Sequence, residues 1–272
     1  MSNMNKLSLD PNGEHMSPLG NSRVDVGYAN IAVKLLKWPD EKTFKSMVFK
    51  ATTATRGNDI HSTEFDEQVI EDAFKGGLNQ CLEWDTLVFE CSGVSRGLTH
   101  ELVRTRRASF AQQSMRHTNM GNPDMRMPTA IHEDLLASAI WLSAIEHCKK
   151  AYRLLVQRDI PFQDARTVLP IATQTYIIAE YPVSEFLATY SYRACHMFYP
   201  EIVYLFHLMK QVTIDKCPWL EPYIKISCEK TASRDGFEHQ CTYQGWERVE
   251  GHCPLAWARE SNRVWKSRKF SS

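Results

Sequence analysis

The run RTRRASFAQQSMR at residues 104–116 concentrates polar side chains that can hold a phosphate group. Four of its residues are arginines, two are serines and two are glutamines. A guanidinium group donates two parallel hydrogen bonds to a phosphate, and hydroxyls and amides add single ones. Because apolar residues are almost absent, the run is not a stripe that packs into a core. These residue types predict a binding site for a small anion.

The composition limits which classes of protein the chain can belong to. It has 272 residues, 43% of them hydrophobic, so it can bury a full core. The 32 basic residues balance 32 acidic ones, which argues against nucleic acid or a membrane surface as partner. No apolar run approaches the ~20 residues that span a bilayer, and the N-terminus lacks an apolar signal core. The eight cysteines are too sparse for a disulfide framework. We therefore expect a cytoplasmic protein with reduced thiols.

Strands and one helix are predicted before the polar run. The segments 30–38 and 86–94 are apolar and partly β-branched, as is typical of strands. Between them, apolar residues recur at helical spacing from Ser62 or Thr63 to Gly76-Gly77. The helical spacing of Leu98, Leu102 and Val103 places the arginines at or just after a helix end.

Helices are predicted after the polar run. Residues 132–157 form the strongest helix, with a broad apolar face. A second helical region is expected at 171–192, and a third helix at 200–213, before Cys217-Pro218. Early strands followed by later helices indicate an α+β fold.

Three ordered blocks resemble the flavin-dependent thymidylate synthase family. The first is GVSRGLTHELVRTR at 93–106, continued by the serines and glutamines up to Arg116. The second, DARTVLP at 164–170, is similar to the family element AR-x-x-LP. The third is Arg193, with Glu-Ile eight positions later, which fits the segment LR-x-x-x-x-A-Q-x-E-I. Three blocks in order, within roughly residues 30–215, are far more specific than one short motif.

The resemblance implies an architecture and a reaction. The fold would be a mixed sheet with a helical layer at 25–220, between a flexible arm at 1–24 and an extension at 221–272. In the family, reduced FAD takes the methylene carbon of methylene-tetrahydrofolate and passes it to C5 of dUMP, and hydride transfer gives dTMP. NADPH supplies the reducing equivalents. Members of the family are homotetramers with shared active sites.

The resemblance also implies the site residues. Ser114 and Arg116 would hold the nucleotide phosphate, with Arg166 from a neighbouring subunit. Arg193 would polarise the pyrimidine, and it is expected to be catalytic together with Ser114. The expected substrate-binding residues are Glu101, Gln112, Gln113, Ser114, Arg116, Arg166 and Arg193. The expected flavin-binding residues are Arg104, Thr105, Arg106, Arg107 and Ser109.

The departures from the family pattern fall mainly on the flavin side. Thr105 replaces a histidine, and the upstream HES-x-x-EH element falls on residues 79–85 with none of its residues kept. An Asn-Ala-Arg falls on residues 182–184, which lack the arginine. Glu101 replaces a glutamine, and a carboxylate that faced the base would prefer the amino group of dCMP. Alternative functions are therefore a hydroxymethylase, an enzyme acting on dCMP, a non-flavin nucleotide-modifying enzyme, or a non-catalytic nucleotide-binding protein.

Cysteines and histidines near the C-terminus do not predict a metal site. Zinc sites usually show closely paired ligands, such as C-x2-C, and this segment has no such pair of knuckles. The residues concerned are Cys228, His239, Cys241, His252 and Cys253. We therefore expect no metal.

Overall fold

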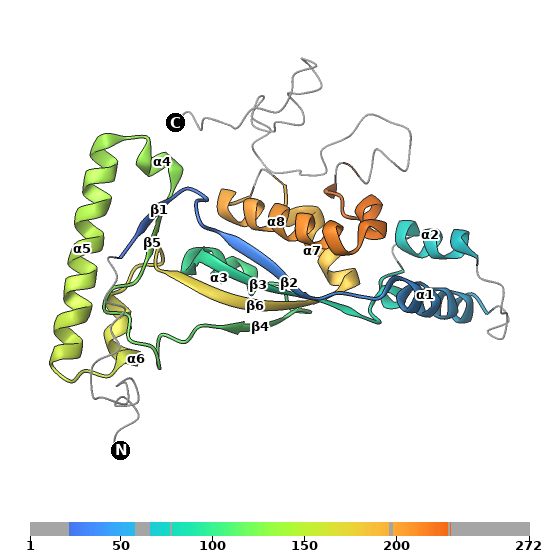
Figure 1. The fold of residues 1–272 in the computed structure, drawn as a ribbon, viewed down its shortest axis with the longest axis horizontal. Helices are drawn as coiled ribbons and strands as arrows, with labels where there is room; N and C mark the ends of the chain where they lie inside the picture. The colour runs from blue at the N-terminus through green and yellow to red at the C-terminus, as the bar shows by residue number, and fades with distance from the viewer. Residues whose placement is uncertain (1–21, 58–65, 77, 196–197, 228, 230–272) are drawn as a thin grey trace, which may run out of the picture. The chain divides into compact units, whose positions relative to one another are not determined.

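The computed structural model describes residues 22–57, 66–76, 78–195, 198–227 and 229 (Figure 1). Most of the expected arm at 1–24 and of the expected extension at 221–272 lies outside these residues. The chain divides into two compact units. Unit 1 comprises residues 1–32, 91–101 and 111–177, and unit 2 comprises residues 33–90, 102–110 and 178–272.

A four-stranded sheet has the order β2-β3-β6-β4. The strands are β2 (Ala32–Lys37), β3 (Thr86–Ser95), β6 (Gln174–Pro182) and β4 (Ser109–Gln112). The strands predicted at 30–38 and 86–94 are thereby confirmed as β2 and β3. Strands and helices together give the expected α+β class.

The helix predicted over 171–192 is wrong in its first half, where the chain forms β6. Burial alternates along this strand, and Thr175, Ile177 and Ala179 are buried while Tyr176 is exposed. This is the two-residue period of a strand, and β-branched and aromatic residues favour it. Pro182 ends the strand and precedes α7 (Val183–Arg193). The second half of the predicted segment is therefore helical, as expected.

Unit 1 contains a short parallel strand pair and the long helix α5. Strand β1 (Val24–Val26) pairs with β5 (Met125–Met127), and α3 (Arg96–Leu102) follows β3. Helix α4 (Thr129–His132) leads into α5 (Leu135–Gln157), which confirms the helix predicted there. Asp134 caps α5 by accepting a hydrogen bond from the Ala137 backbone N–H at 2.9 Å. After α5 come α6 (Phe162–Ala165) and a 3-10 turn, η3 (Arg166–Val168).

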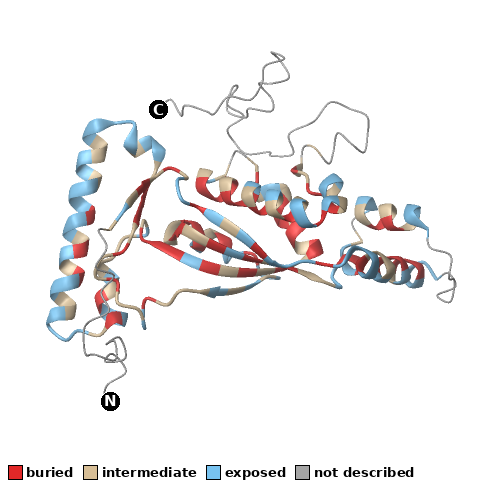
Figure 2. Cartoon of the chain, viewed as in Figure 1, coloured by how far each residue is buried: buried red, intermediate tan, exposed pale blue. Residues whose placement is uncertain are grey.

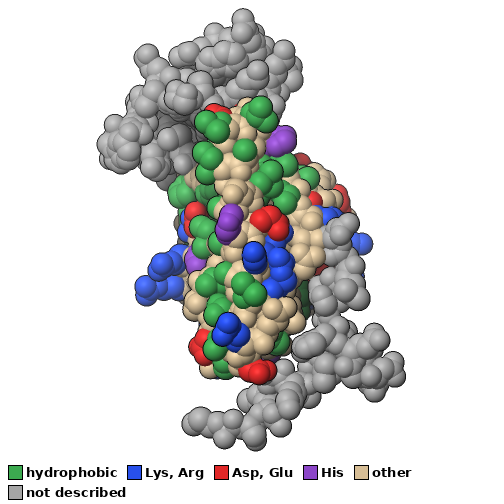
Figure 3. Space-filling model, turned by 90° about the vertical axis from the view of Figure 1, so that its left-hand side faces the viewer, with side chains coloured by type: hydrophobic (Ala, Val, Ile, Leu, Met, Phe, Trp, Pro, Cys, Tyr) green, Lys and Arg blue, Asp and Glu red, His purple; other side chains and the backbone are tan. Residues whose placement is uncertain are grey.

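Helix α5 is largely exposed, and Figure 2 shows few buried residues along it. The sequence predicts a broad apolar face for this helix, and three residues of that face are largely exposed: Leu135 is 88% exposed, Leu136 72% and Ile140 63%. Figure 3 shows hydrophobic side chains gathered along the outward side of α5. The buried side is formed by Ile145, Lys149 and Tyr152. The described residues therefore leave much of this apolar surface exposed.

Unit 2 contains two pairs of packed helices, and aromatic side chains fill its core. Helix α1 (Glu41–Thr55), which the sequence analysis did not predict, lies beside α2 (Glu67–Gly76) (Figure 1). After α2 comes a 3-10 turn, η2 (Asn79–Leu82), and helices α7 and α8 (Pro200–Lys216) pack together before η4 (Pro218–Tyr223). Phe89, Tyr181, Phe186 and Phe206 are fully buried and form ring contacts, so they fix α7 and α8 against the strands of this unit.

No helix in the described part of the chain is both long and apolar enough to cross a membrane.

Candidate functional site

One small core cluster in unit 1 positions three polar side chains. The cluster contains Met115, Met120, Tyr152, Phe162 and Ala165, all buried. Arg116 directly follows Met115, Gln163 follows Phe162, and Arg166 follows Ala165. Burying each preceding residue fixes the backbone from which the polar side chain extends. A single packed cluster thus holds side chains that lie fifty positions apart in the chain at the surface of the same unit.

Gln163 links the two arginines. Arg116 donates from Nη2 to the Gln163 side-chain oxygen, over 3.5 Å. Arg166 donates from Nε to the Gln163 backbone carbonyl, over 3.2 Å. The structure therefore brings Arg116 and Arg166 of one chain to the same glutamine, where the sequence analysis expected Arg166 from a neighbouring subunit.

Arg96, in the first turn of α3, is a third cation of this cluster. Its Nη2 donates to the Gln113 carbonyl at 2.6 Å, while its Nε is buried and has no hydrogen-bond partner among the described residues. Burial lowers the pKa of Arg96, and the nearby charge of Arg166 lowers it further. Like charges repel, so an anion that bound here would relieve the repulsion. Sequence reasoning quoted Arg96 within the first block and gave it no role.

The glutamines and Ser114 are held by a network of backbone and side-chain bonds. Gln112 donates to the Thr99 hydroxyl at 2.9 Å, and the Gln113 N–H donates to the Tyr176 carbonyl at 3.1 Å. The Ser114 hydroxyl accepts from the Arg116 backbone N–H at 3.2 Å, which keeps the two residues together in one turn. Glu101 lies half-buried in α3.

A buried arginine fixes the start of the first block. Arg126 is 3% exposed and donates to the carbonyls of Gly27 at 2.5 Å, Ala29 at 2.9 Å and Gly93 at 2.9 Å. Gly93 has a φ of +71°, and a Cβ added there would lie 2.3 Å from the Asn30 carbonyl oxygen. Only glycine fits this left-handed, crowded position. It lies three residues before Arg96 and sets the direction in which β3 enters α3.

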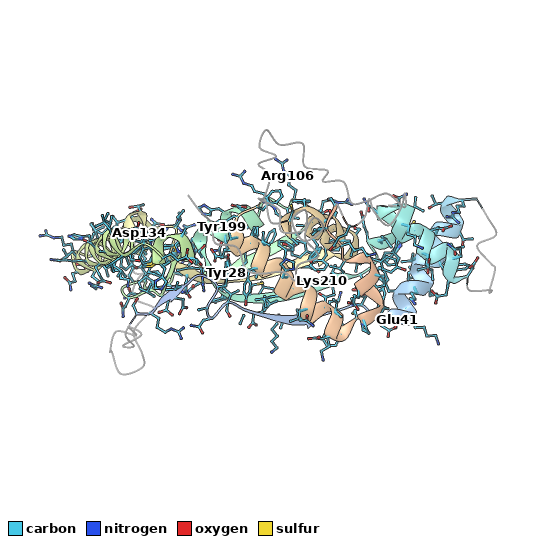
Figure 4. The ribbon with its side chains drawn as sticks, turned by 90° about the horizontal axis from the view of Figure 1, so that it is seen from above. Tyr28, Glu41, Arg106, Asp134, Tyr199 and Lys210 are labelled. Carbon is cyan, nitrogen blue, oxygen red and sulfur yellow. The ribbon has the colours of Figure 1, made fainter. Side chains whose placement is uncertain are left out.

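The expected flavin residues lie in unit 2, on the loop after α3 and at the start of β4. Arg104 and Arg106 are exposed and make no hydrogen bond or ion pair with another described residue, and Figure 4 shows Arg106 pointing away from the ribbon. Thr105 between them is buried, at 4% exposure, and its hydroxyl has no partner within the described residues. Ser109 is exposed. The loop thus presents two guanidinium groups outward around one inward threonine.

Arg107 is engaged within unit 2 by an acidic residue. It forms an ion pair with Glu83, which lies in the stretch 79–85 where the family element is replaced. The two side chains are 57% and 34% exposed, so the pair stabilises the loop only weakly. Of the three arginines of this loop, only Arg107 has an ion-pair partner among the described residues.

Arg193 ends α7 in unit 2. Its guanidinium carbon lies 5.4 Å from the ring centroids of both Tyr192 and Phe198. A cation at a helix C-terminus also interacts favourably with the helix dipole. The structure thus brings together Arg96, Arg116 and Arg166 in unit 1, while Arg193 and the loop arginines belong to unit 2.

No group of three or more metal-binding side chains occurs among the described residues. The C-terminal cysteines and histidines considered for zinc lie outside them.

The chain is thus an α+β protein with a cluster of arginines in unit 1, and the comparisons with known proteins name its family. The family model "Thymidylate synthase complementing protein" matches residues 35–219. The chain belongs to this family, which confirms the resemblance seen in the sequence.

Named relatives agree with the family, and a solved structure shares the fold. The flavin-dependent thymidylate synthase of Geobacter sulfurreducens is 35% identical over 122 residues, which cover 44% of this chain and 52% of that protein. The enzyme of the same name from Nitratidesulfovibrio vulgaris is 31% identical over 169 residues, covering 59% and 69%. The chain therefore matches about half of the first relative's length. A UMP/dUMP methylase, PolB from Streptomyces cacaoi, solved with 5-Br dUMP, superposes with a TM-score of 0.60 at 19% identity, covering 73% of this chain and 96% of that chain. This likeness shows the shared fold.

Proposed function

We propose that the protein transfers a one-carbon unit from methylene-tetrahydrofolate, through a reduced flavin, to C5 of a pyrimidine deoxynucleotide monophosphate, converting dUMP to dTMP. The observation that carries the proposal is the convergence of Arg96, Arg116 and Arg166 in unit 1. The names of the relatives, flavin-dependent thymidylate synthase, support the reaction.

The three arginines supply what a phosphate monoester requires. A phosphate monoester carries nearly two negative charges at neutral pH and offers three acceptor oxygens. Arg116 and Arg166 each bring a guanidinium group to Gln163, and the Nε–H of Arg96 has no hydrogen-bond partner among the described residues. Ser114 adds a hydroxyl beside Arg116. We assign the phosphate to these four residues, with Gln112 and Gln113 shaping the loop around it.

Arg193 is assigned to the base, and we propose it as a catalytic residue. A guanidinium at the pyrimidine stabilises the negative charge that develops when C5 becomes nucleophilic. Because this charge grows along the reaction, a variant of Arg193 is expected to lose turnover more than affinity.

The loop of unit 2 fits the anionic part of FAD. Arg104 and Arg106 are exposed donors for a diphosphate, and Ser109 adds a hydroxyl. Bound there, the flavin would supply the redox and carbon-carrier chemistry. The chain's own contribution would be to hold the diphosphate and keep the loop in place through the ion pair between Arg107 and Glu83. NADPH as reductant is part of the same proposal, as is a cytoplasmic location, where the five free cysteines of the described chain would stay reduced.

We propose a homotetramer whose subunits cover the exposed face of α5. Leu135, Leu136 and Ile140 expose apolar surface that a soluble monomer rarely leaves as a continuous patch. A second copy of the same helix face would bury it. Light scattering of the purified protein tests the assembly, and Leu136→Glu is expected to shift it toward smaller species, whereas Leu154→Glu, at the other end of the helix, serves as a comparison.

A product measurement tests the reaction. The purified protein is incubated with dUMP, methylene-tetrahydrofolate, FAD and NADPH, and the nucleotide is analysed by mass. A gain of one methyl group supports the proposal, and a gain of one hydroxymethyl group or a product from dCMP alone replaces it by the corresponding alternative. Calorimetric titration with dUMP and spectroscopic titration with FAD measure nucleotide binding and flavin binding separately. Binding of dUMP without uptake of FAD would favour a nucleotide-binding protein that does not use flavin.

A further inference from the structure

Helix α3 holds the loop of the proposed phosphate site through two of its side chains, both within unit 1. The Arg96 guanidinium donates to the Gln113 carbonyl at 2.6 Å. Thr99, one turn further along α3, accepts from the Gln112 side-chain Nε2 at 2.9 Å. Thr99 is 1% exposed, so its hydroxyl group is largely shielded from water. Two successive residues of the loop are therefore fixed from the same helix.

The direction of the hydrogen bonds at Thr99 fixes the orientation of the Gln112 amide. The Thr99 hydroxyl also contacts the Arg96 backbone carbonyl, at 3.0 Å. A carbonyl oxygen can only accept, so Thr99 donates its single proton there. The lone pairs of the hydroxyl oxygen then face Gln112, and only the NH2 group of the amide can donate to them. The Gln112 side-chain oxygen, Oε1, has no hydrogen-bond donor among the described residues.

We infer that Thr99 is a positioning residue, which holds Gln112 so that Oε1 accepts a hydrogen bond from the bound nucleotide. The inference rests on the proposed function. Gln112 lies two residues before Ser114 and four before Arg116, which are both assigned to the phosphate. A glutamine side chain loses conformational entropy when a ligand immobilises it. Because Thr99 already restricts Gln112, part of this entropy is lost before the nucleotide binds, which favours binding.

Thr99→Val tests the positioning role, because valine has nearly the shape of threonine and lacks the hydroxyl group. It should weaken dUMP binding by about 3- to 10-fold in calorimetric titration, as expected for one lost hydrogen bond. Thr99→Ser keeps the hydroxyl and should bind dUMP nearly as the wild type does. In a Gln112→Leu background, Thr99→Val should cause no further loss. A loss that persists in that background, or an equal loss in Thr99→Ser, would refute the inference.

The Gln112 side-chain amide gives a readout that needs no nucleotide. Its NH2 resonances in a nitrogen–proton NMR spectrum are identified by their absence in Gln112→Leu. Because one NH2 proton is bonded to a buried hydroxyl, it should exchange with solvent more slowly than the amide protons of the exposed Gln157. Thr99→Val should remove this protection, and Thr99→Ser should keep it. Equal exchange rates in the wild type and Thr99→Val would overturn the orientation assigned to Gln112.

An analogue of dUMP identifies the group that donates to Gln112. The nucleotide offers a sugar hydroxyl and the N–H of its base as donors, and the dideoxynucleotide analogue lacks the hydroxyl. If the hydroxyl is the donor, the wild type and Thr99→Val should bind the analogue equally well. If the base N–H is the donor, the difference between the two proteins should remain.

Thr213→Val is the matched control. Thr213 is fully buried in α8, and its hydroxyl donates to the Met209 carbonyl of the same helix at 2.8 Å. The substitution removes a buried hydroxyl of the same kind and should leave both the Gln112 exchange rate and dUMP binding unchanged. If the wild type binds no dUMP, the proposed function fails, and the inference with it, even where the amide is protected. If the wild type binds dUMP and Thr99→Val binds it equally well, the inference fails and the proposed function stands.

Discussion

Replacing Arg166 by glutamine should have opposite effects on the free and the nucleotide-bound protein. In the free protein, burial is the main cause of the lowered pKa of Arg96, and the charge of Arg166 lowers it further. The two cations therefore repel each other. Arg166→Gln removes this repulsion and leaves a shorter, uncharged side chain that can still form hydrogen bonds. The bond that is lost, from Nε to the Gln163 carbonyl at 3.2 Å, is exposed and contributes little. The free variant should therefore be slightly more stable than the wild type.

The magnitudes follow from the exposure of these groups. Partly exposed charges interact by no more than about 1 kcal/mol, which corresponds to a melting temperature about 1–3 °C higher for a domain of this size. Added salt should reduce the gain, because it screens the repulsion. Loss of a charged hydrogen bond to the phosphate costs about 1.5–3 kcal/mol, so dUMP affinity should fall about 10- to 150-fold.

Thermal melts with and without dUMP, together with calorimetric titration, measure both effects. Arg153→Gln is the control, because Arg153 is an exposed arginine of unit 1 that also donates to one carbonyl, that of Gly121, at 3.2 Å. It should change neither quantity. An Arg166→Gln protein that melts lower than the wild type and binds dUMP equally well would refute the assignment of this cluster to the phosphate.

Three further predictions concern residues that support the site. Gly93→Ala should cost about 2–4 kcal/mol of unfolding free energy, whereas Gly57→Ala, with a similar φ of +69° and nothing within 4 Å of its Cβ, should cost only about 1 kcal/mol; denaturant titration compares them, and equal losses would exclude the clash with Asn30. Arg126→Met should destabilise the protein by about 2–4 kcal/mol, because three carbonyls that accept from this buried guanidinium lose a charged donor, and Arg126→Lys should recover part of the loss in the same titration. Burial raises the pKa of the Cys217 thiol from 9.0 to about 11, so its contribution to stability is complete below pH 9 and is lost as pH rises toward 11. The stability difference between wild type and Cys217→Ala should therefore shrink over that window, by an amount on the order of 2 kcal/mol, and a constant difference would contradict the shift.

The sequence predicted the elements whose periodicity is strong and the site residues that lie in one run. Strands β2 and β3 and helices α5 and α8 follow from apolar patterns that are clear within a single segment. Strand β6 was missed because its apolar residues are compatible with either period, and only the burial of alternate side chains distinguishes them. Helix α1 has a low density of large apolar residues, and its best signal was Asp40, whose side chain accepts from the Thr43 N–H at 2.9 Å.

The convergence of site residues needed the structure. Arg96 lies in the first block and Gln163 directly precedes the second. Nothing in the linear sequence shows that Gln163 accepts hydrogen bonds from both Arg116 and Arg166. The family comparison implied a role for Arg166 and left its position to the fold. The roles assigned to Arg104, Thr105, Arg106, Arg107 and Ser109 stay predictions, as do those of Glu101, Gln112, Gln113 and Ser114.

The interior of unit 1 offers a means of adjusting ligand recognition without touching any ligand-facing side chain. Met120 and Tyr152 belong to the buried cluster, and the Met120 N–H donates to the Tyr152 hydroxyl at 3.0 Å, yet neither carries a charge. Repacking them would shift the backbone that carries Arg116 and the backbone that carries Arg166 at the same time, because a close-packed core transmits a change of volume to its neighbours. Preference among phosphorylated ligands could thus change through substitutions that an inspection of the binding surface alone would overlook.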